Sequence, residues 1–376
     1  MPSSIPIPSL LQPISNEDAC SSYLAELHNE MPYAASQFGL VLTTALERRQ
    51  AGKEPVVKQP HFRSKAMPVP GSDNKGPIDF TNIDVTVSGH VATFSARCEP
   101  LLMRAAAAVV DAKSSAEELA DRASSENFSK ALRQFDDPLI QGHCENFLSL
   151  IPAILEHSSA EQARVGEDPT NVGCYCINDI WKDPINSLLD NRLQLWTRAV
   201  KFVISEEDLL KTEPEIRARC QQLEEEQGLV LGPMVESDVK LMIERNKISF
   251  DEEYGKWIIK RSLCFRNKQG DMVAWGGTHG DFSIAALHVL PEYRKAGLGK
   301  LVLNSLALLH VRLARNALTS SGSKEDDEIP ASSLFAHSDC VEDNLPTMVF
   351  MERCGWRRIG NYLWFGVPYN ANAEAN

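Results

Sequence analysis

The chain has 376 residues, of which 43% are hydrophobic and 24% charged, and its formal net charge is −13 at pH 7. This length predicts about two domains, and the composition is that of a globular protein able to bury a core. Because nucleic-acid binding depends on a basic surface, the acidic balance argues against a nucleic-acid partner.

The first segment, residues 1–12, is rich in Pro and Ser and has no basic stretch, so it does not resemble a signal peptide. No apolar run approaches the ~20 residues that span a bilayer, and we expect no membrane partner. The nine Cys residues are scattered, and the one close pair, Cys174 and Cys176, lacks the two-residue spacing of a CxxC motif. We therefore expect reduced, mostly buried thiols and no metal in a cytoplasmic protein, and the nucleus is also compatible.

The first half of the chain predicts a helix-rich region with a few short strands. Helices are expected at residues 101–112, 116–135, 145–157 and 178–199, and strands at residues 83–87, 91–94 and 199–204. Residues 64–79 and 319–333 are rich in Pro, Gly or Ser and predict exposed loops. The highly charged residues 206–227 predict a solvated helix that leads to an inter-domain connection near Gly228.

From residue 229 onward the pattern changes to short strands. We expect a short helix ending at Glu244, strands at residues 257–265, 272–278, 282–289, 334–338 and 359–367, and helices at residues 300–317 and 344–354. A strand meander followed by alternating strands and helices predicts an α/β fold with a mixed sheet, not a doubly wound dinucleotide fold. The chain is therefore expected to divide into a helix-rich, substrate-shaping N-terminal domain, residues 1–228, and an α/β domain, residues 229–376.

The segment LHVLPEYRKAGLGK, residues 287–300, joins an apolar strand to an apolar helix. Gly297 and Gly299 allow the backbone to turn tightly and to approach a ligand closely. Backbone amides at a helix N-terminus attract anions. Three basic side chains add positive charge to this segment: Arg294, Lys295 and Lys300. A local basic site of this kind is compatible with the acidic net charge of the whole chain. The segment therefore predicts a pyrophosphate site.

Two pyrophosphate motifs do not fit this segment. A Walker P-loop needs Gly where this chain has Arg294, and Ser or Thr where it has Leu301. A dinucleotide fingerprint needs a small residue where this chain has Val302. The Arg-x-x-Gly-x-Gly pattern, with HVLPEYR before it and a helix after it, instead resembles the acyl-CoA loop of the GNAT N-acetyltransferase superfamily.

The resemblance continues on both sides of the loop, over about residues 229–367. Downstream, LFAHS at 334–338, then Asp343-Asn344 and CGW at 354–356, is similar to the second GNAT motif. Upstream, GDMVAW at 270–275 resembles the glycine N-acyltransferase-like branch, in which a Trp ends the run.

The first half of the chain resembles the degenerate first domain of the same branch. The match rests on Met31-Pro32-Tyr33 and on the region from Trp181 to residue 204. The resemblance therefore implies a GNAT-like N-terminal domain ahead of the GNAT acyltransferase domain.

The GNAT resemblance implies a sheet in which two neighbouring strands splay into a V, and acetyl-CoA or another acyl-CoA as co-substrate. The pantetheine arm would pair with the backbone of Leu287 and Val289 inside that V. Asn344 would hydrogen-bond the pantetheine, or cap its own helix, or both. The diphosphate would be held by the loop residues Arg294, Lys295, Ala296, Gly297, Leu298, Gly299 and Lys300.

Acyl transfer from a thioester to an amine has three requirements. The amine must lose a proton, because an alkylamine titrates at about 10. The carbonyl oxygen must be stabilised as its negative charge builds, and the amide of Val289 is a candidate donor. The leaving thiolate needs a proton donor. Since GNAT enzymes attack directly, none of the Cys residues is needed as a nucleophile.

Two positions depart from the family pattern. Met351 stands where many GNAT enzymes carry a Tyr general acid, and Ser283 stands where the glycine N-acyltransferase-like branch carries a Glu base. Ser283 can order a water but cannot itself accept the proton. His288 has a suitable proton affinity, although strand alternation places it on the opposite face from Ser283. Asp281 and His337 are the other candidates, and each of the four residues could instead be structural.

Three functions follow from these observations. The first is an acyl-CoA-dependent N-acyltransferase acting on a small amine or amino acid, which the two-domain length favours. The second is an acetyltransferase acting on protein Lys residues or N-termini, since an acidic surface suits basic peptides. The third is a CoA-binding module without turnover, which the absent Tyr and Glu would explain.

Overall fold

The computed structural model describes residues 171–319 and 333–368 without a break, together with shorter stretches. The shorter stretches are residues 11–13, 23–25, 27–28, 31, 35–51, 61–64, 83–88, 91–96, 99, 148, 151–152, 154–156, 158–160, 163 and 330. None of the helices within these ranges is long and apolar enough to cross a membrane.

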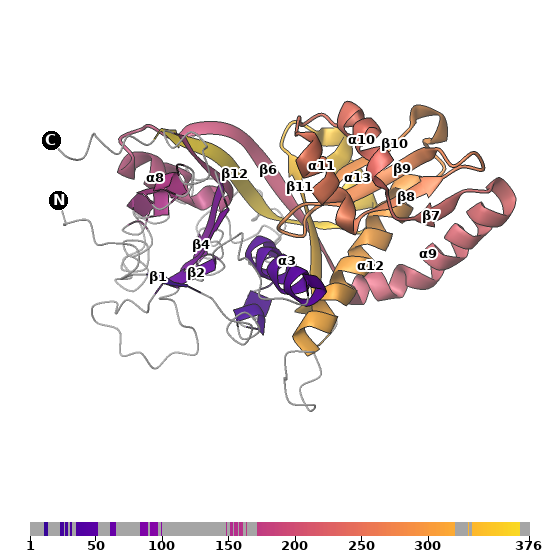
Figure 1. The fold of residues 1–376 in the computed structure, drawn as a ribbon, viewed down its shortest axis with the longest axis horizontal. Coiled ribbons are helices and arrows are strands. Elements are labelled where there is room, and N and C mark those ends of the chain that lie inside the picture. The colour runs from indigo at the N-terminus through magenta and orange to yellow at the C-terminus, as the bar shows by residue number, and fades with distance from the viewer. Residues whose placement is uncertain are drawn as a thin grey trace, which may run out of the picture.

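Strands of both halves of the chain form two sheets with helices packed on their faces (Figure 1). The strands are β1 (Leu11–Pro13), β2 (His61–Ser64), β3 (Ile83–Ser88), β4 (Val91–Ala96), β5 (Asn171–Asn178), β6 (Gln194–Ser205), β7 (Val230–Gly232), β8 (Leu263–Arg266), β9 (Met272–Thr278), β10 (Ile284–Val289), β11 (Phe335–Val341) and β12 (Arg357–Pro368). The helices are α3 (Ala35–Ala51), α8 (Lys182–Leu188), α9 (Glu206–Gln227), α10 (Val239–Arg245), α11 (Glu252–Ile258), α12 (Leu298–Thr319) and α13 (Leu345–Arg353).

The larger sheet has the strand order β1-β2-β3-β4-β5-β12-β6-β11, and the smaller has the order β10-β9-β8-β7. Among the strands that the structure describes in the larger sheet, β4 and β5 pair in parallel and the other neighbours are antiparallel, so this sheet is mixed. This sheet curls. The Sγ of Cys176 on β5 lies 3.6 Å from the Oδ2 of Asp339 on β11, whereas three strand spacings in a flat sheet would separate the two strands by roughly 14 Å.

The two sheets meet where β10 approaches β11. Ser283, just before β10, forms a parallel bridge with His337, and the Ser338 hydroxyl donates to the carbonyl of Ile284 at 2.8 Å. No strand pairing continues between β10 and β11 beyond these contacts among the described residues, so the strands separate into a V. We call the end at Ser283 and His337 the apex of the V.

A β-bulge interrupts β10 inside the V. The register with β9 shifts between Ala285 and His288, and Ala286 has φ 51. A bulge bends its strand and redirects the following backbone groups. The bend accompanies the departure of β10 from β11.

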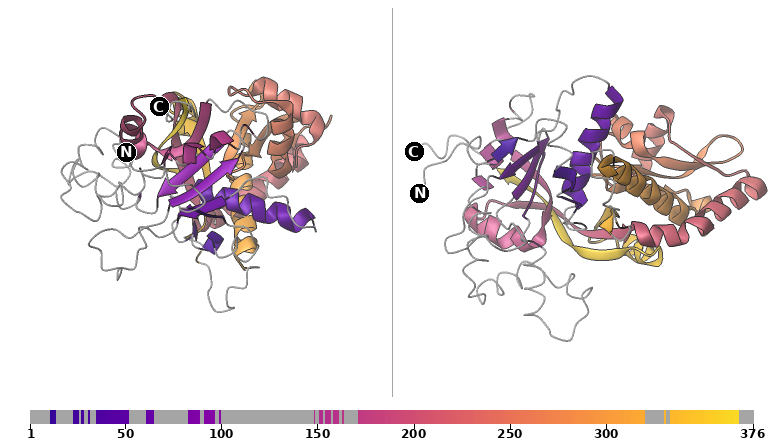
Figure 2. Two further views of the ribbon diagram at one scale, coloured as in Figure 1. Left: turned by 60° about the vertical axis from the view of Figure 1, so that its left-hand side comes forward. Right: turned by 90° about the horizontal axis from the view of Figure 1, so that it is seen from below.

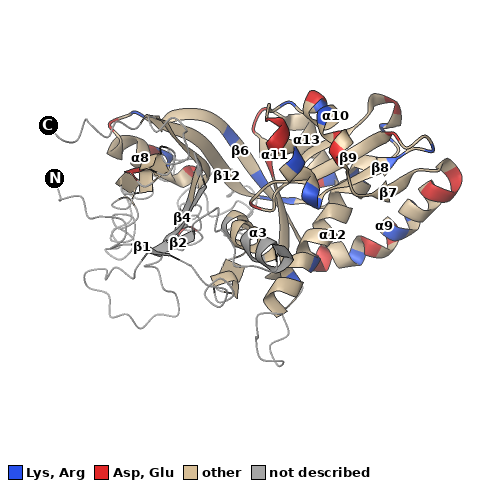
Figure 3. Ribbon diagram, in the orientation of Figure 1, with Lys and Arg blue, Asp and Glu red and all other residues tan. Residues whose placement is uncertain are grey.

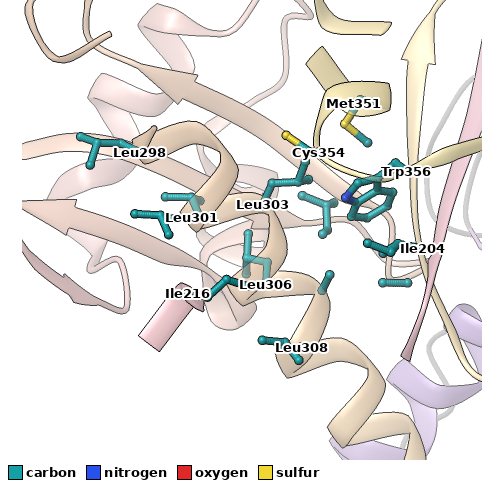
Figure 4. Packing of buried hydrophobic residues seen from close by; sticks show 14 of the residues in the cluster. Ile204, Ile216, Leu298, Leu301, Leu303, Leu306, Leu308, Met351, Cys354 and Trp356 are labelled. Carbon is teal, nitrogen blue, oxygen red and sulfur yellow. The ribbon is translucent and has the colours of Figure 1, made fainter. Parts of the chain in front are cut away.

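Helices α12 and α9 pack together on one side of the V and enclose the main core (Figure 4). The α12 residues Leu298, Leu301, Leu303, Leu306 and Leu308 are buried there. The cluster also includes residues of β6, of α13 and of the smaller sheet, and Ile204, Met351, Cys354 and Trp356 are among its members. The opposite side of α9 carries interspersed acidic and basic residues (Figure 3), as expected for a solvated helix face.

Helices α10 and α11 cover the other face of the smaller sheet around a second cluster that includes Met242, Ile258 and Trp275. Gly277 of β9 permits this packing, because a Cβ there would lie 2.2 Å from Cγ2 of Ile258. We call the side of the V that faces α11 and α3 the concave side.

Helix α3 connects the N-terminal half to the apex of the V. It contacts β3 and β4 as well as β11 and α12, and Figure 2 shows it running beside α12 in the view from below. Gly39 lies against the turn before β10, where a Cβ would come within 1.8 Å of the Asp281 carbonyl oxygen. Thr43 donates from Oγ1 to the carbonyl of Gly280 at 2.8 Å.

Most predicted elements of the C-terminal half are confirmed with shifts of a few residues, including the strand at 272–278 and the long helix after the loop. Two predictions are wrong in part. Residues 257–265 were expected to form one strand, but Trp257 and Ile258 end α11 and the strand starts at Leu263. Residues 178–199 were expected to be helical, but the helix ends at Leu188 and β6 starts at Gln194.

The expected division between residues 228 and 229 falls between α9 and β7. Gly228 has φ 66 and ends α9 in a left-handed conformation, which favours Gly. Strand β6, from before this point, pairs with both β11 and β12 from after it. Helix α9 likewise packs on α12. One sheet and one core therefore span the expected boundary.

Several expectations lie outside the described residues. These are the helices at 101–112 and 116–135 and nearly all of the loops at 64–79 and 319–333. Of the stretch 145–157, residues 148, 151–152 and 154–156 are described, and they are helical. The six Cys residues within the described ranges carry free thiols, as expected: Cys174, Cys176, Cys220, Cys264, Cys340 and Cys354.

Candidate functional site

The open edge of β10 presents its backbone to the V. The amide of Leu290 donates to the carbonyl of Val273 on β9, and Val289 is opposite Ala274. Because hydrogen-bonded residues alternate along an antiparallel ladder, the amide of Val289 points away from β9 and towards the V. Leu287 lies within the bulge, where the register with β9 shifts, and its pairing with pantetheine stays a prediction. The Val289 carbonyl already accepts a hydrogen bond from Nε of Arg294 at 3.1 Å.

The glycine loop between β10 and α12 is open on its outer side. Lys295 and Gly297 both have left-handed backbone conformations, with φ 66 and φ 83, and a Cβ at Gly297 would meet no atom within 4 Å. The first intrahelical bond of α12 runs from the amide of Leu301 to the carbonyl of Gly297 at 3.2 Å. The preceding amides therefore have no acceptor within the helix and can bind an anion.

The side chains of the loop divide into an exposed cationic set and an anchored set. Arg294, Lys295 and Lys300 are exposed, whereas Leu298 is buried in the main core. A Cβ at Gly299 would lie 3.3 Å from Cζ of Phe350 on α13. Close packing thus fixes the start of α12, while the cationic side chains and the exposed Gly297 remain available to a diphosphate.

Asn344 precedes α13 but does not cap it through its side chain, which makes no capping hydrogen bond. Its carbonyl instead accepts from the amides of Thr347 and Met348, at 3.0 and 3.1 Å. The prediction of a side-chain cap is therefore wrong, and the pantetheine contact stays a prediction. Met351, at the family's Tyr position, is 2% exposed and lies in the core.

At the apex of the V, Asp281 is held by hydroxyl and amide donors. Its Oδ1 accepts from the amide of Ser283 at 3.0 Å and from the Ser283 hydroxyl at 2.6 Å, and its Oδ2 accepts from the Ser36 hydroxyl at 2.8 Å. Burial would raise the pKa of Asp281, but the charges of His337 and Lys201 outweigh it and hold that pKa well below its ordinary value. Asp281 is therefore a stable carboxylate and a weak base.

A buried ammonium group completes the apex. The side chain of Lys201 on β6 is 0% exposed, and its Nζ lies 2.8 Å from Oδ1 of Asp339 and 2.9 Å from the Ser36 hydroxyl. Burial alone would lower the pKa of Lys201, but Asp339 raises it above its ordinary value. Lys201, Ser36 and Asp281 therefore form one continuous hydrogen-bonded network.

Cys176 adjoins the two carboxylates of this network, and its Sγ and one oxygen of each carboxylate lie within 4.8 Å of one another. Burial and then Asp339 raise the pKa of Cys176 well above its ordinary value, so the thiol keeps its proton. Because the Lys201 ammonium supplies the positive charge between the carboxylates, the group is an ion-pair network and we assign no metal to it.

The predicted histidines occupy different environments. His337 is 2% exposed, its Nε2 lies 2.8 Å from the Asp281 carbonyl oxygen, and burial lowers its pKa. His288 stacks on Trp275 with ring centroids 4.7 Å apart, and burial and then Arg294 lower its pKa. The structure thus brings Ser283, Asp281 and His337 together at the apex and places His288 on the far side of the bulge.

Sequence reasoning missed Ser36, Cys176, Lys201 and Asp339, which lie on α3, β5, β6 and β11. It also missed His279 in the turn after β9, whose Nδ1 lies 2.7 Å from the Tyr254 hydroxyl oxygen on α11. A Lys and an Asp inside apolar strands were the available signal, because charges in such runs are buried only when paired. Nothing in the sequence pairs Lys201 with Asp339 before the strand order is known.

No family model matches the sequence, and no curated protein matches it. Among solved structures, a Drosophila protein from a structural genomics consortium matches over 95% of this chain and 98% of its own, with a TM-score of 0.50 and 12% identity. A tandem GNAT protein from the clavulanic acid biosynthesis pathway matches over 96% of this chain and 99% of its own, with a TM-score of 0.42 and 9% identity. A GCN5-related N-acetyltransferase from Kribbella flavida matches over 60% and 79%, with a TM-score of 0.34 and 12% identity.

The full-length likeness to the Drosophila protein is one of fold. The expected order is present: the meander β7 to β10, the glycine loop, α12, the splayed strand β11, α13 and the final strand β12. The fold prediction is confirmed: this chain has a mixed α/β fold with two splayed strands, as the resemblance to the GNAT superfamily implies.

Proposed function

We propose that this protein is an acyl-CoA-dependent N-acyltransferase that transfers the acyl group directly to an amine. The observation that carries the proposal is the V between β10 and β11, which opens beside a glycine loop with unpaired amides and exposed cations. A strand edge with free backbone groups suits the amides of pantetheine. A helix N-terminus with basic side chains suits a diphosphate.

In this proposal the backbone of β10 orients the thioester. The amide of Val289, or an amide of the adjacent bulge, donates to the carbonyl oxygen as negative charge develops there. The amine attacks the carbonyl carbon, the new C–N bond forms, and the C–S bond breaks to release CoA. Arg294 and the other loop cations, Lys295 and Lys300, retain the diphosphate throughout.

The substrate class in the proposal is a small amine or an amino acid, by resemblance to the glycine N-acyltransferase-like branch. The contribution of the first half of the chain to the apex supports this substrate class, since the side chains of Ser36 and Cys176 both reach the apex. We therefore propose that residues 1–228 shape the acceptor side of the V. A protein acceptor and CoA binding without turnover are the alternative outcomes of the test.

The test is thiol release from acetyl-CoA in the presence of a panel of amines, amino acids and basic peptides, with mass spectrometry of the products. We expect an acylated small amine and one thiol per product.

Arg294→Gln removes a loop charge and the hydrogen bond to the Val289 carbonyl, so the KM for acetyl-CoA should rise about tenfold, equivalent to ~1.4 kcal/mol. The control is Arg312→Gln, which removes an Arg from α12 that is paired with Glu213 on α9 and should leave KM unchanged. Tight CoA binding without thiol release from any acceptor would contradict the enzymatic function.

A further inference from the structure

A second pair of polar side chains lies on the concave side of the V, outside the residues that the sequence singled out. The hydroxyl oxygen of Tyr254 lies 2.7 Å from Nδ1 of His279, and the two rings stack with centroids 5.8 Å apart at 20°. Trp257 also stacks with Tyr254, with ring centroids 6.0 Å apart at 5°. Helix α11 thus fixes the position of the imidazole.

The backbone places His279 at the apex of the V. The amide of His279 donates to the carbonyl of Ser283 at 2.9 Å, and the amide of Phe282 donates to the carbonyl of His279 at 3.0 Å. Residues opposite each other on antiparallel strands project to the same face, so His279 projects to the same face as Ser283 and, two residues on, Ala285. In the bulge that follows, Ala285 and Ala286 carry only methyl groups, and Leu287 lies on the α12 side, where a Cβ at Gly276 would come 3.4 Å from its Cδ1.

Among the imidazoles at the apex of the V, that of His279 has an accessible nitrogen, and His288 lies away from the apex on the far side of the bulge. His337 and His310 are each 2% exposed, and the Nε2 of His288 is sealed from solvent. His279 is half-buried, and its Nε2 is neither sealed nor hydrogen-bonded within the part of the chain that the structure describes. When Nδ1 carries the hydrogen and donates it to Tyr254, Nε2 keeps a lone pair that faces outward.

The network beside His279 carries one net negative charge, from Asp281 and Asp339 against Lys201, and Cys176 and Tyr254 are neutral. The guanidinium of Arg261, which lies over the rings of Trp257 and Phe282, adds one positive charge nearby. Burial lowers the pKa of His279, and Asp281 and Asp339 oppose that effect. Burial and then Asp281 raise the pKa of Tyr254, which therefore stays protonated and serves as a hydrogen-bond partner.

We propose that His279, oriented by Tyr254, is the base that deprotonates the acceptor, and that the acceptor enters the V as a cationic amine drawn to the Asp281–Lys201–Asp339 network. This inference rests on the proposed function and assigns it a substrate class and a catalytic residue. The ammonium gives one proton to Nε2 of His279, and the freed lone pair forms the C–N bond as the C–S bond breaks. The second proton of the amine leaves with the sulfur as the CoA thiol, and the imidazolium returns its proton to water.

The test compares His279→Gln with the wild type in acetyl-CoA turnover from about pH 4.5 to 9. Gln keeps a polar partner for Tyr254 but cannot accept the proton, so kcat should fall by about 100-fold or more. Because the pKa of His279 is lowered from 6.5, the wild-type rate should rise with pH below 6.5. That rising limb should be lost in the variant, while the Kd for CoA stays unchanged. The control is His310→Gln, which removes another imidazole of this region and should change kcat less than about threefold. A purely structural role for His279 would leave the pH profile intact.

A second variant carries the test if His279→Gln does not fold. Tyr254→Phe keeps the stacked ring and removes the hydroxyl, so kcat should fall about tenfold with the acetyl-CoA KM unchanged. Wild-type rates and an unaltered pH profile in either folded variant would overturn the assignment of His279 while leaving the proposed function intact. A wild-type protein that binds CoA and acylates no amine at all would instead overturn the proposed function, and with it this inference.

Discussion

Lys201 is a fully buried cation, and its environment explains how it remains charged. Its ammonium contacts Asp339 and Ser36 and lies 4.8 Å from the centre of the Tyr362 ring. Transfer of an unpaired charge from water to a protein interior is strongly unfavourable, whereas a paired and hydrogen-bonded charge is tolerated. The pairing therefore links the stability of three separate segments, α3, β6 and β11, at the apex of the V.

Lys201→Met should destabilise the protein by about 3–5 kcal/mol, because it leaves the buried carboxylate of Asp339 without its partner. Equilibrium urea unfolding measures the change. The control is Lys211→Met, which removes an exposed ammonium from α9 and should leave the unfolding midpoint where it is. A Lys201→Met protein as stable as the wild type would show that the network contributes nothing to folding.

At the residue scale, the phosphate loop could be predicted and the apex could not. The loop is contiguous, and its glycines and basic residues have a local physical meaning that a sequence displays directly. The apex joins residues far apart in the chain: Lys201 to Asp339 spans 138 positions and Lys201 to Ser36 spans 165. Their proximity depends on the strand order and on the curl of the sheet, which no local pattern encodes.

Helix α3 and the turn before β10 are in direct backbone contact, and the contact depends on a residue without a side chain. Gly39→Ala would place a Cβ 1.8 Å from the Asp281 carbonyl oxygen and 2.9 Å from Cβ of Phe282. Since neither group can move without displacing the turn, we expect a loss of about 1–3 kcal/mol in the free energy of unfolding. Turnover should also fall, because the same turn carries His279 and Asp281.

The control for this helix is Gly232→Ala, since a Cβ at Gly232 would meet no atom within 4 Å. Urea unfolding and thiol release should leave that variant near the wild type. Equal stability and activity in the Gly39 and Gly232 variants would mean that α3 is not packed on the turn.

At the element scale, the two wrong boundaries have identifiable causes. The run from Trp257 to Phe265 is apolar at both ends, and each end suits either a strand or a buried helix end. The polar residues 260–262 (Lys-Arg-Ser) separate the two ends. Asp251 was the overlooked signal, because its side chain accepts the Tyr254 amide at 2.7 Å and caps α11. Likewise, Asp190 and Asn191 adopt left-handed conformations, which is typical of a turn and separates α8 from β6.

At the scale of the whole molecule, strands from the two halves of the chain alternate within one sheet. Strand β6 lies between β11 and β12, and β12 lies between β5 and β6. A division of the chain at residue 228 therefore cuts one sheet. The core on α12 also draws on both sides of that point, with Phe202 and Leu209 on one side and Leu303 and Trp356 on the other.

A fragment of residues 229–376 should not fold cooperatively, because it lacks β6 and α9 and leaves Asp339 without Lys201. Circular dichroism during thermal unfolding, with the full chain as the control, measures this. Cooperative unfolding of the fragment together with wild-type affinity for CoA would show that the C-terminal half is autonomous.

The central claim is that the V and the glycine loop hold an acyl-CoA. An experimental structure of the full chain bound to CoA tests it most directly. The expected result is a diphosphate on the amides of Gly297 to Lys300 and a pantetheine arm along Val289, with the thiol directed to the apex. The claim would be contradicted by CoA bound elsewhere, for example in the open cavity of about 460 Å³ lined by Asp238, Asn267 and Glu292, with the V unoccupied.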